Sequence, residues 1–534
     1  MPDTHLLSQP SHDAQPGWRI LALLLLGYTL LLRAPGLLHE LPIHSDAPAF
    51  LSVLALFRGE WLGTNAPFRI EYPVYPYLMY LANRFVSDWV LAAKWAALVP
   101  SVLSSIAVFG ATQVLSRDRY AAFFAGFLAA SSPELIRIGT APLYDSTFLC
   151  MFALFLLVGF LFVRRPTSRM ALCIGIVIGL CWASRALGLF LVLPLLCTIF
   201  VQPGLSAMRK CRLSLIVFAT FFIVAGLVRL PAKIAAKSLP PDHTQCVKDV
   251  MLDGIRYAGD NRDTVVYRLN DSATAFRFDE SSPCTLTWRQ YLSIYYKDQI
   301  IAFAKNLKRI IFYDFVTIVS PFLVFFVPLC VGVRQLWNKQ DKPAILLIAT
   351  TAVSFLIFVS AIQYQNRYLF PLIILVAVVS GIGCAELLRH GKAARALLTA
   401  LMVLTLGGGI DGCRQTLIKD ESEANYRKAC QWIVENDGKS FDFRVMARHY
   451  GVYAYLKHGL ILLPVDEPQR VKSFAEHSNV KYILAGPEER RHNPALFDGL
   501  PFLRPVGEFG VGPQSVQIFE VTQNSSYSHD QQMD

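Results

Sequence analysis

Runs of predominantly apolar residues recur along this chain, and many approach the roughly 20 residues that an α-helix needs to cross a bilayer. They lie at about 18–35, 88–116, 120–134, 143–163, 170–184, 186–202, 213–232, 315–333, 343–362, 367–387 and 395–410. Only 17% of the 534 residues are charged, whereas a soluble protein carries about 25%. The sequence therefore predicts an α-helical polytopic membrane protein with about eleven transmembrane helices, whose membrane region extends over residues 18–411.

Basic residues are concentrated in alternate short loops, which predicts the orientation of the helices. These loops lie at about 117–119, 164–169, 203–212, 334–342 and 388–395. Because cytoplasmic loops are enriched in Lys and Arg, we expect them on the cytoplasmic side, together with a disordered segment at residues 1–17. The loops at 37–87 and 233–304 then lie on the outer side. This topology accounts for the net charge of +11, and no long basic run points to a nucleic-acid partner.

The chain changes character after about residue 412. Amphipathic stretches such as NYRKACQWIVEN alternate there with strand-like runs such as FRVMAR, VKYILAG and SVQIFEV. Helices that alternate with short β-rich runs are typical of an α/β domain. We therefore expect an extramembrane α/β domain at 412–522 on the outer side, followed by a disordered tail at 523–534.

Four of the eleven cysteines lie outside the apolar runs, in two local pairs. Cys246 and Cys284 share the second long outer loop, and Cys413 and Cys430 flank the start of the α/β domain. On an oxidising outer side each pair could form a disulfide. For the first pair the disulfide is favoured, whereas for the second pair two free thiols are an equally good interpretation.

Ionisable residues gather at the outer ends of several apolar runs. Asp46 precedes a short amphipathic stretch in the first outer loop, and Asp145 opens the run at 143–163. Each Asp could cap a helix N-terminus, or both could face one polar cavity, where ionisable groups at membrane depth are tolerated. Further ionisable or aromatic residues expected on this side are Arg58, Arg185, Asp314, Tyr364, Arg367 and Tyr368.

The order of these features carries a resemblance to a known family. An Asp lies in the first outer loop, EYPVYPYLMYL leads into the second span, and a second Asp precedes a later span. An RY..P motif opens a late span, and an α/β domain ends the chain. This order resembles the GT-C superfamily of polyprenyl-phosphate-sugar-dependent glycosyltransferases, which includes protein O-mannosyltransferases and lipid A aminoarabinose transferases. The resemblance covers nearly the whole chain and implies the GT-C fold.

The resemblance also implies roles for individual residues. The family's catalytic Asp falls on Asp46 and its second acidic position on Asp145, although the first loop reads DAPAF where many members have a Glu and a Tyr. The RY..P segment, here Arg367, Tyr368 and Pro371, resembles the element that helps to hold the donor phosphate. Further candidates for contacts with this phosphate, on the same membrane face, are Tyr364, Arg185 and Arg58.

The resemblance implies an inverting glycosyltransferase, a hexosyl- or pentosyl-transferase. It would move a sugar from a polyprenyl-phosphate donor to a lipid, glycan or protein acceptor at the outer face of a bacterial cytoplasmic membrane. The leaving phosphate departs as an anion and needs positive charge, for which the guanidinium of Arg367 is suited. The acceptor must lose a proton, which Asp46 would take as general base. This scheme requires no cofactor; a divalent metal stays open, because the sequence has no recognisable ligand spacing.

The alternative is a transporter or flippase of a lipid-linked sugar. Such a protein would line a pathway through the bilayer, with ionisable groups near mid-span and on both faces. Here the candidate residues gather on one face, beside two substantial outer segments. This distribution favours a transfer reaction at that face.

Overall fold

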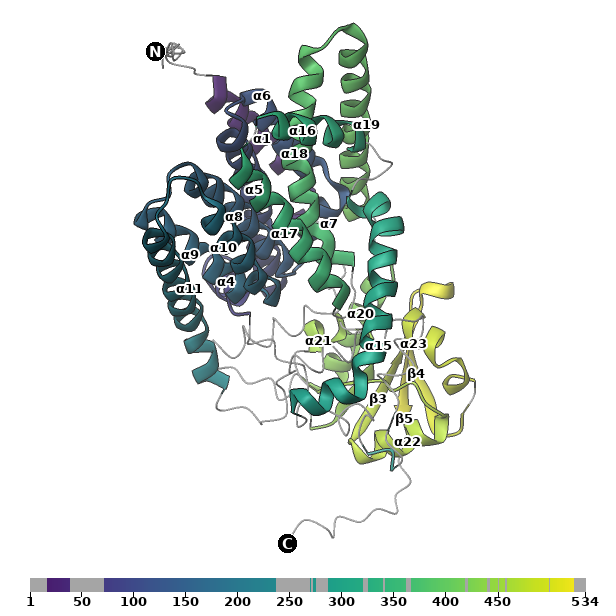
Figure 1. The fold of residues 1–534 in the computed structure, drawn as a ribbon. Helices are drawn as coiled ribbons and strands as arrows, with labels where there is room; N and C mark the ends of the chain where they lie inside the picture. Colours follow the sequence, from purple (N-terminus) through teal and green to yellow (C-terminus); the bar gives the residue numbers. More distant parts are fainter. Residues whose placement is uncertain are drawn as a thin grey trace, which may run out of the picture.

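The computed structural model describes residues 17–38, 72–236, 269, 272–274, 287–319, 325–339, 341–361, 366–417, 421–438, 442–449, 451–456, 459–498 and 500–522. They form a bundle of long helices with a small α/β domain at one end (Figure 1). Five residues singled out above lie outside this described part of the chain: Asp46, Arg58, Cys246, Cys284 and Tyr364.

The bundle is built from helices that follow the apolar runs. In chain order they are α1 (Gly17–Arg33), α2 (Pro35–Leu38), α4 (Val74–Asn83), α5 (Trp89–Ser116), α6 (Arg119–Ser131), α7 (Pro133–Thr140), α8 (Asp145–Arg164), α9 (Ser168–Ser184), the 3₁₀ segment η1 (Ala186–Leu191), α10 (Val192–Val201), α11 (Ala207–Ala236), α15 (Trp288–Arg309), the π-helical segment η4 (Ile310–Val319), α16 (Phe326–Asn338), α17 (Lys342–Ala361), the 3₁₀ segment η6 (Asn366–Leu369), α18 (Phe370–Arg389) and α19 (Lys392–Leu417).

Seven helices of the described part are long and apolar enough to cross a membrane, or up to eight if α6 and α7 form one broken span with a 61° bend. The apolar helices at Ser168–Ser184 and Ala186–Val201 are shorter than a full span. The run predicted at 315–333 differs from a single helix, because η4 extends to Val319 and α16 begins only at Phe326. The multi-pass helical architecture is confirmed, whereas the number of eleven spans stays a prediction.

Helix α18 forms the centre of the bundle and is almost entirely buried. It packs against α5, α6 and α16. Lipid tails are as apolar as Leu, so close packing between membrane helices depends on small residues. A Cβ at Gly381 would overlap α6 at Ala125, and a Cβ at Gly383 would overlap the carbonyl oxygen of Pro328 in α16. These glycines therefore set the short distances between α18 and its neighbours.

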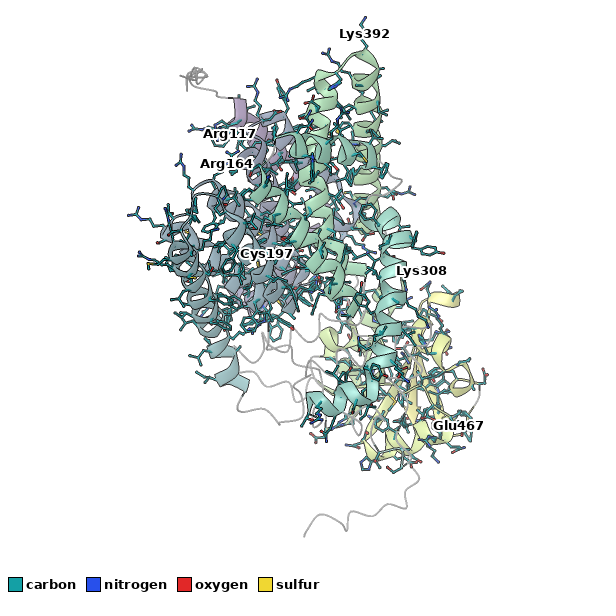
Figure 2. All side chains as sticks on the ribbon, in the orientation of Figure 1. Arg117, Arg164, Cys197, Lys308, Lys392 and Glu467 are labelled. Carbon is teal, nitrogen blue, oxygen red and sulfur yellow. The ribbon has the colours of Figure 1, made fainter. Side chains whose placement is uncertain are left out.

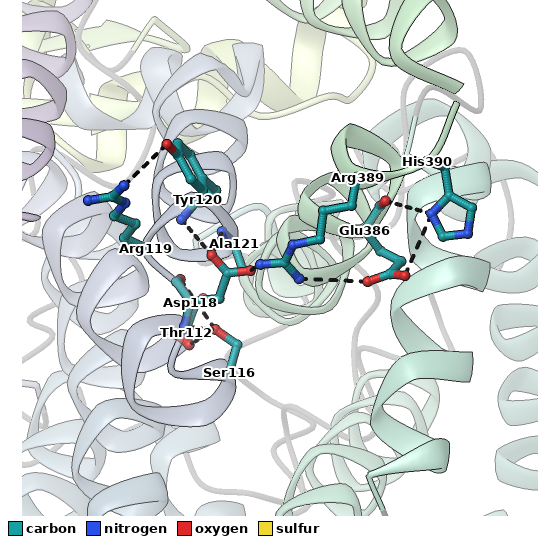
Figure 3. Close-up of polar contacts among 9 residues, drawn as sticks. All are labelled: Thr112, Ser116, Asp118, Arg119, Tyr120, Ala121, Glu386, Arg389 and His390. Atoms are coloured by element: carbon teal, nitrogen blue, oxygen red, sulfur yellow. Dashed lines mark hydrogen bonds and ion pairs between the residues drawn. The ribbon is translucent and has the colours of Figure 1, made fainter. Parts of the chain in front are cut away.

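An ion-pair cluster joins the start of α6 and the end of α18 (Figure 3). Arg117 and Lys392, which are close to it in sequence, lie at the end of the bundle away from the α/β domain (Figure 2). Asp118 accepts hydrogen bonds from the backbone N–H groups of Tyr120 (2.9 Å) and Ala121 (3.5 Å), and so caps α6. The same carboxylate pairs with Arg389 at the end of α18. Arg389 also lies 3.7 Å from a carboxylate oxygen of Glu386.

The predicted cytoplasmic loops lie together in the structure. Figure 2 shows Arg117, Arg164 and Lys392 toward one end of the bundle, whereas Glu467 marks the α/β domain at the other end. This arrangement agrees with the distribution of charge expected for a cytoplasmic face. We therefore refer to the opposite end as the domain side of the bundle.

The C-terminal region forms the expected α/β domain around a five-stranded sheet with the strand order β2-β1-β3-β5-β4. Its elements are α20 (Glu421–Asp437), β1 (Arg444–Ala447), α21 (Gly451–Leu456), β2 (Leu460–Leu462), α22 (Pro468–His477), β3 (Val480–Ala485), α23 (Pro487–His492), η7 (Pro494–Leu496), β4 (Leu503–Phe509), η8 (Gly512–Gln514) and β5 (Val516–Val521). Strands β2, β1 and β3 are parallel, and β5 is antiparallel to β3 and β4.

A buried carboxylate organises the ends of β1 and β3. Glu489 accepts hydrogen bonds from the backbone N–H groups of Arg448 (2.7 Å), His449 (2.9 Å) and Gly486 (3.0 Å). It also accepts one from the hydroxyl of Tyr426. Burial, with the nearby Glu489 charge, raises the pKa of Tyr426 far above its ordinary value. Both carboxylate oxygens of Glu489 therefore accept hydrogen bonds that stabilise the α/β domain.

The disulfide considered for Cys413 and Cys430 is not present, because both are free thiols. Cys413 belongs to α19, whereas Cys430 belongs to α20 and is buried in the apolar core of the α/β domain. Burial raises the pKa of the Cys430 thiol well above its ordinary value. The second interpretation, two free thiols, is therefore the correct one.

Candidate functional site

Three residues distant in sequence meet on the domain side of the bundle. Asp145 is the first residue of α8, and Arg185 directly follows α9. Because α8 ends at Arg164 on the far side (Figure 2), Asp145 and the end of α9 both lie toward the domain. Arg367 belongs to η6, at the end of α18 opposite Arg389. The antiparallel helices α8 and α9 and the start of α18 thus place these three side chains together.

The three side chains form a buried charged cluster. Arg185 donates a hydrogen bond to one carboxylate oxygen of Asp145, and Arg367 lies 3.7 Å from the other oxygen. The exposed fractions of the side chains are only 1% for Asp145, 4% for Arg185 and 10% for Arg367. Two guanidinium groups share one carboxylate, so the cluster has a net charge of +1. Guanidinium groups held side by side in this way are well suited to bind a phosphate or carboxylate anion.

Aromatic rings surround the guanidinium groups. The Arg185 guanidinium carbon lies 4.9 Å from the ring centroid of Tyr144 and 4.5 Å from that of Tyr368. The Arg367 guanidinium carbon lies 5.9 Å and 6.0 Å from the same two rings. Such cation–π contacts stabilise a partly desolvated guanidinium. Tyr72 stacks on Tyr144, with 6.1 Å between the ring centroids.

The α/β domain approaches this site. Leu460 of β2 packs against an apolar cluster that includes Tyr75, Ala93 and Tyr144. Tyr144 therefore contacts both the charged cluster and the apolar cluster that touches the domain. The domain consequently contacts the apolar cluster to which Tyr144, the neighbour of Asp145, belongs.

The structure contradicts the first interpretation of Asp145, that of a helix cap. Tyr144 occupies the N-cap position of α8, and no side chain forms a cap hydrogen bond there. The Asp145 carboxylate faces Arg185 and Arg367 instead. Asp145, Arg185, Arg367 and Tyr368 are therefore brought together as a group. Sequence reasoning missed Tyr144, although its position directly before Asp145 was a signal.

Asp314 lies in the π-helical segment η4, which packs against η6. Its carboxylate is buried and lies 3.4 Å from Nε of Arg309. The part of the chain that the structure describes contains no group of three or more His, Cys, Asp or Glu residues that could hold a metal. The charged cluster supplies one carboxylate, and both its oxygens face guanidinium groups, an arrangement that suits an anion rather than a cation.

Comparison with known proteins identifies the fold. No family model and no curated protein matches the sequence. ArnT from Cupriavidus metallidurans, solved bound to undecaprenyl phosphate, is similar over 94% of this chain and 97% of its own, with a TM-score of 0.57 and 12% identity. The Archaeoglobus fulgidus oligosaccharyltransferase, solved in a complex with Zn and sulfate, is similar over 93% and 72%, with a TM-score of 0.59 and 13% identity. The protein is a multi-pass membrane protein with the GT-C fold.

Proposed function

We propose that the protein is an integral-membrane glycosyltransferase that moves a sugar from a polyprenyl-phosphate donor to an acceptor. The buried cluster of Asp145, Arg185 and Arg367 carries this proposal, because it holds two guanidinium groups side by side inside a GT-C fold. We further propose that the domain side of the bundle is the outer face of a bacterial cytoplasmic membrane. The similar ArnT structure, which holds undecaprenyl phosphate, supports the donor class.

The reaction breaks the bond between the sugar's anomeric carbon and the donor phosphate oxygen. That oxygen keeps the bonding electrons, and polyprenyl phosphate leaves as an anion. Fixed guanidinium groups in a water-poor site stabilise such developing charge without reorganising. In this scheme Arg367 contacts the phosphate, and Arg185 adds to the positive field.

Asp145 has the role of a positioning residue in this scheme. Its carboxylate holds both guanidinium groups, which would otherwise repel each other in a buried place. The Tyr144 and Tyr368 rings restrict the same groups from the sides. The phosphate site is therefore preorganised before the donor arrives.

The acceptor oxygen or nitrogen forms the new bond to the anomeric carbon and releases a proton. We assign this proton to the carboxylate of Asp46, acting as general base. Tyr364 and Arg58 are proposed as further donor contacts from the loops near the site. We assign no step to a metal. The acceptor is a lipid, a glycan or a protein side chain within reach of the membrane surface.

The test measures binding of undecaprenyl phosphate to the full-length protein in nanodiscs. We expect Arg367→Ala to weaken binding by one to two decades, because losing a hydrogen bond to a charged group costs about 1.5–3 kcal/mol. Arg137→Ala is the matched control, since Arg137 is an exposed arginine paired with Glu134. Equal affinity of the wild type and Arg367→Ala would refute the phosphate role.

A second measurement separates the enzyme from a transporter. Mass spectrometry of envelope glycans and glycolipids, with and without the gene, should show a missing sugar modification. Reconstituted protein should also release polyprenyl phosphate from the donor. Movement of an intact lipid-linked sugar between leaflets, without cleavage, would support the flippase alternative instead.

A further inference from the structure

Helix α15 has one face that packs against the bundle. The side-chain amide of Gln299 donates a hydrogen bond to the carbonyl oxygen of Ala361 (2.6 Å). The side-chain amide of Asn306 donates one to the carbonyl oxygen of Ser360 (3.2 Å). Ala302, between them, is buried. These contacts hold α15 against the last turn of α17, at its domain-side end.

The face of α15 that points away from α17 carries three exposed lysines, Lys297, Lys305 and Lys308. With Ile301 they follow the spacing i, i+4, i+8 and i+11, which places them in one stripe along the helix. We call Lys297, Lys305 and Lys308 the lysine stripe. None of the three has an ion-pair partner among the described residues. The single acidic residue of α15 is Asp298.

The lysine stripe lies beside surface that is suited to lipid. Ile301, between Lys297 and Lys305, is 52% exposed, and the π-helical segment η4 that follows α15 exposes Phe312 and Tyr313 by 67% each. Figure 2 shows Lys308 on α15 near the level where the bundle meets the α/β domain. Apolar side chains that follow directly on a basic stripe are typical of the boundary between acyl chains and headgroups, where lysine stems extend toward the phosphates.

We propose that the lysine stripe binds the phosphate groups of anionic phospholipids in the leaflet on the domain side. Charge complementarity identifies this partner, because the three exposed ammonium groups have no ion-pair partner in the described part of the chain and lie beside an apolar surface. This binding anchors α15, and with it the neighbouring segments η4 and η6, at the membrane surface. The inference concerns a surface separate from the charged cluster and does not depend on the proposed reaction.

The experiment titrates phosphatidylglycerol into the purified full-length protein in detergent and follows the bound lipid by native mass spectrometry. The test variant is Lys305→Gln/Lys308→Gln. The matched control is Lys428→Gln/Arg491→Gln, which removes two positive charges from exposed positions of the α/β domain. Each lysine near a membrane surface contributes about a factor of five, so we expect half-saturation of the test variant to shift by about 25-fold. The control should shift by less than about twofold.

Two further arms identify the ligand. Phosphatidylcholine should bind wild type and test variant alike, and inorganic phosphate at the same concentration should not compete with phosphatidylglycerol. Lys305→Arg/Lys308→Arg keeps the charge and should bind phosphatidylglycerol like the wild type, which separates loss of charge from misfolding. An unchanged half-saturation in the glutamine variant, or full competition by inorganic phosphate, would overturn the proposal.

Discussion

The buried carboxylate of Asp145 and the two guanidinium groups that face it stabilise one another, and none of the three charges is favourable there alone. Removing water from three charges has a large free-energy cost, and the mutual attraction offsets it only when the geometry is good. Asp145 meets this condition because each of its oxygens faces a different arginine. Its replacement would remove the carboxylate that faces both Arg185 and Arg367. We therefore expect the same residue to affect both stability and the proposed anion binding.

We expect Asp145→Asn to lower the free energy of unfolding by about 3–5 kcal/mol, the usual cost of removing one member of a buried ion pair. Undecaprenyl phosphate should raise the melting temperature of this variant more than that of the wild type, because the phosphate supplies the missing negative charge. Melting curves in nanodiscs, with and without the lipid, measure both effects.

Glu134→Gln is the control for this prediction, since it breaks an exposed pair with Arg137 that is worth about 0–1 kcal/mol. A melting temperature of Asp145→Asn equal to that of the wild type would show that the carboxylate has no structural role. A variant that melts lower but gains nothing from undecaprenyl phosphate would remove the cluster from the donor site.

Asp46→Asn separates a general base from a helix cap. Asn caps a helix about as well as Asp, but its amide cannot take the acceptor's proton. We expect transfer to fall by about 100-fold or more, with little change in melting temperature or in undecaprenyl phosphate binding. Sugar transfer from a polyprenyl-phosphate donor in nanodiscs is the measurement. Turnover near the wild-type rate would exclude Asp46 as the base.

At the level of elements, α18 connects the two ends of the bundle. Its far end is held by the Asp118–Arg389 ion pair, and its domain-side end continues from η6, which carries Arg367. Between these ends the helix makes close crossings at Gly381 and Gly383. A change in a crossing distance should therefore affect both stability and the position of Arg367.

Gly383→Ala tests this connection. A methyl group there would overlap the carbonyl oxygen of Pro328, so α16 and α18 would have to separate. Overpacking of this kind costs about 1–3 kcal/mol. We expect a lower melting temperature and weaker binding of undecaprenyl phosphate, measured on the same preparation.

Gly407→Ala is the control, because a Cβ at Gly407 in α19 would meet no atom within 4 Å. Alanine favours the helix by roughly 0.5–1 kcal/mol over glycine, so this variant should be as stable as the wild type or slightly more stable. Equal behaviour of the two variants would mean that the α16–α18 crossing adapts without cost.

At the level of the whole molecule, the two ends of the bundle differ in charge and in what they carry. Arg117, Arg164 and Lys392 lie toward one end, and the α/β domain lies at the other (Figures 1 and 2). The charged cluster lies at the end of α8 opposite Arg164. Leu460 joins the domain to the apolar cluster beside Tyr144. Under the proposed function, we expect the donor to reach the charged cluster from the membrane face on which the domain lies.

Reporter fusions test this orientation. Alkaline phosphatase fused after Gln523 should be active, and green fluorescent protein fused at the same place should be dark, because the positive-inside rule puts the α/β domain outside. Fusions after Lys392 should give the opposite pattern. A cytoplasmic result at Gln523 would reverse the topology and move the proposed reaction to the other face.

Local chemistry made the helices and strands predictable. A bilayer requires long apolar helices with satisfied backbone groups, so the predicted runs match α5, α8 and α18 closely. The strand-like runs FRVMAR, VKYILAG and SVQIFEV contain β1, β3 and β5. The site was predictable only as a list of ionisable residues on one face, since no single-residue pattern reports which side chains touch.

The sequence by itself determined that this is a polytopic helical membrane protein, where most of its membrane helices run, and that its C-terminal region is of the α/β type. These properties follow from periodicity and hydrophobicity within short stretches of sequence. Only the tertiary structure decided that Asp145 pairs with Arg185 and Arg367 instead of capping α8, and that Cys413 and Cys430 stay free. Those outcomes depend on distances between segments far apart in the chain. Such distances are set by how whole helices pack, which no local stretch of sequence specifies.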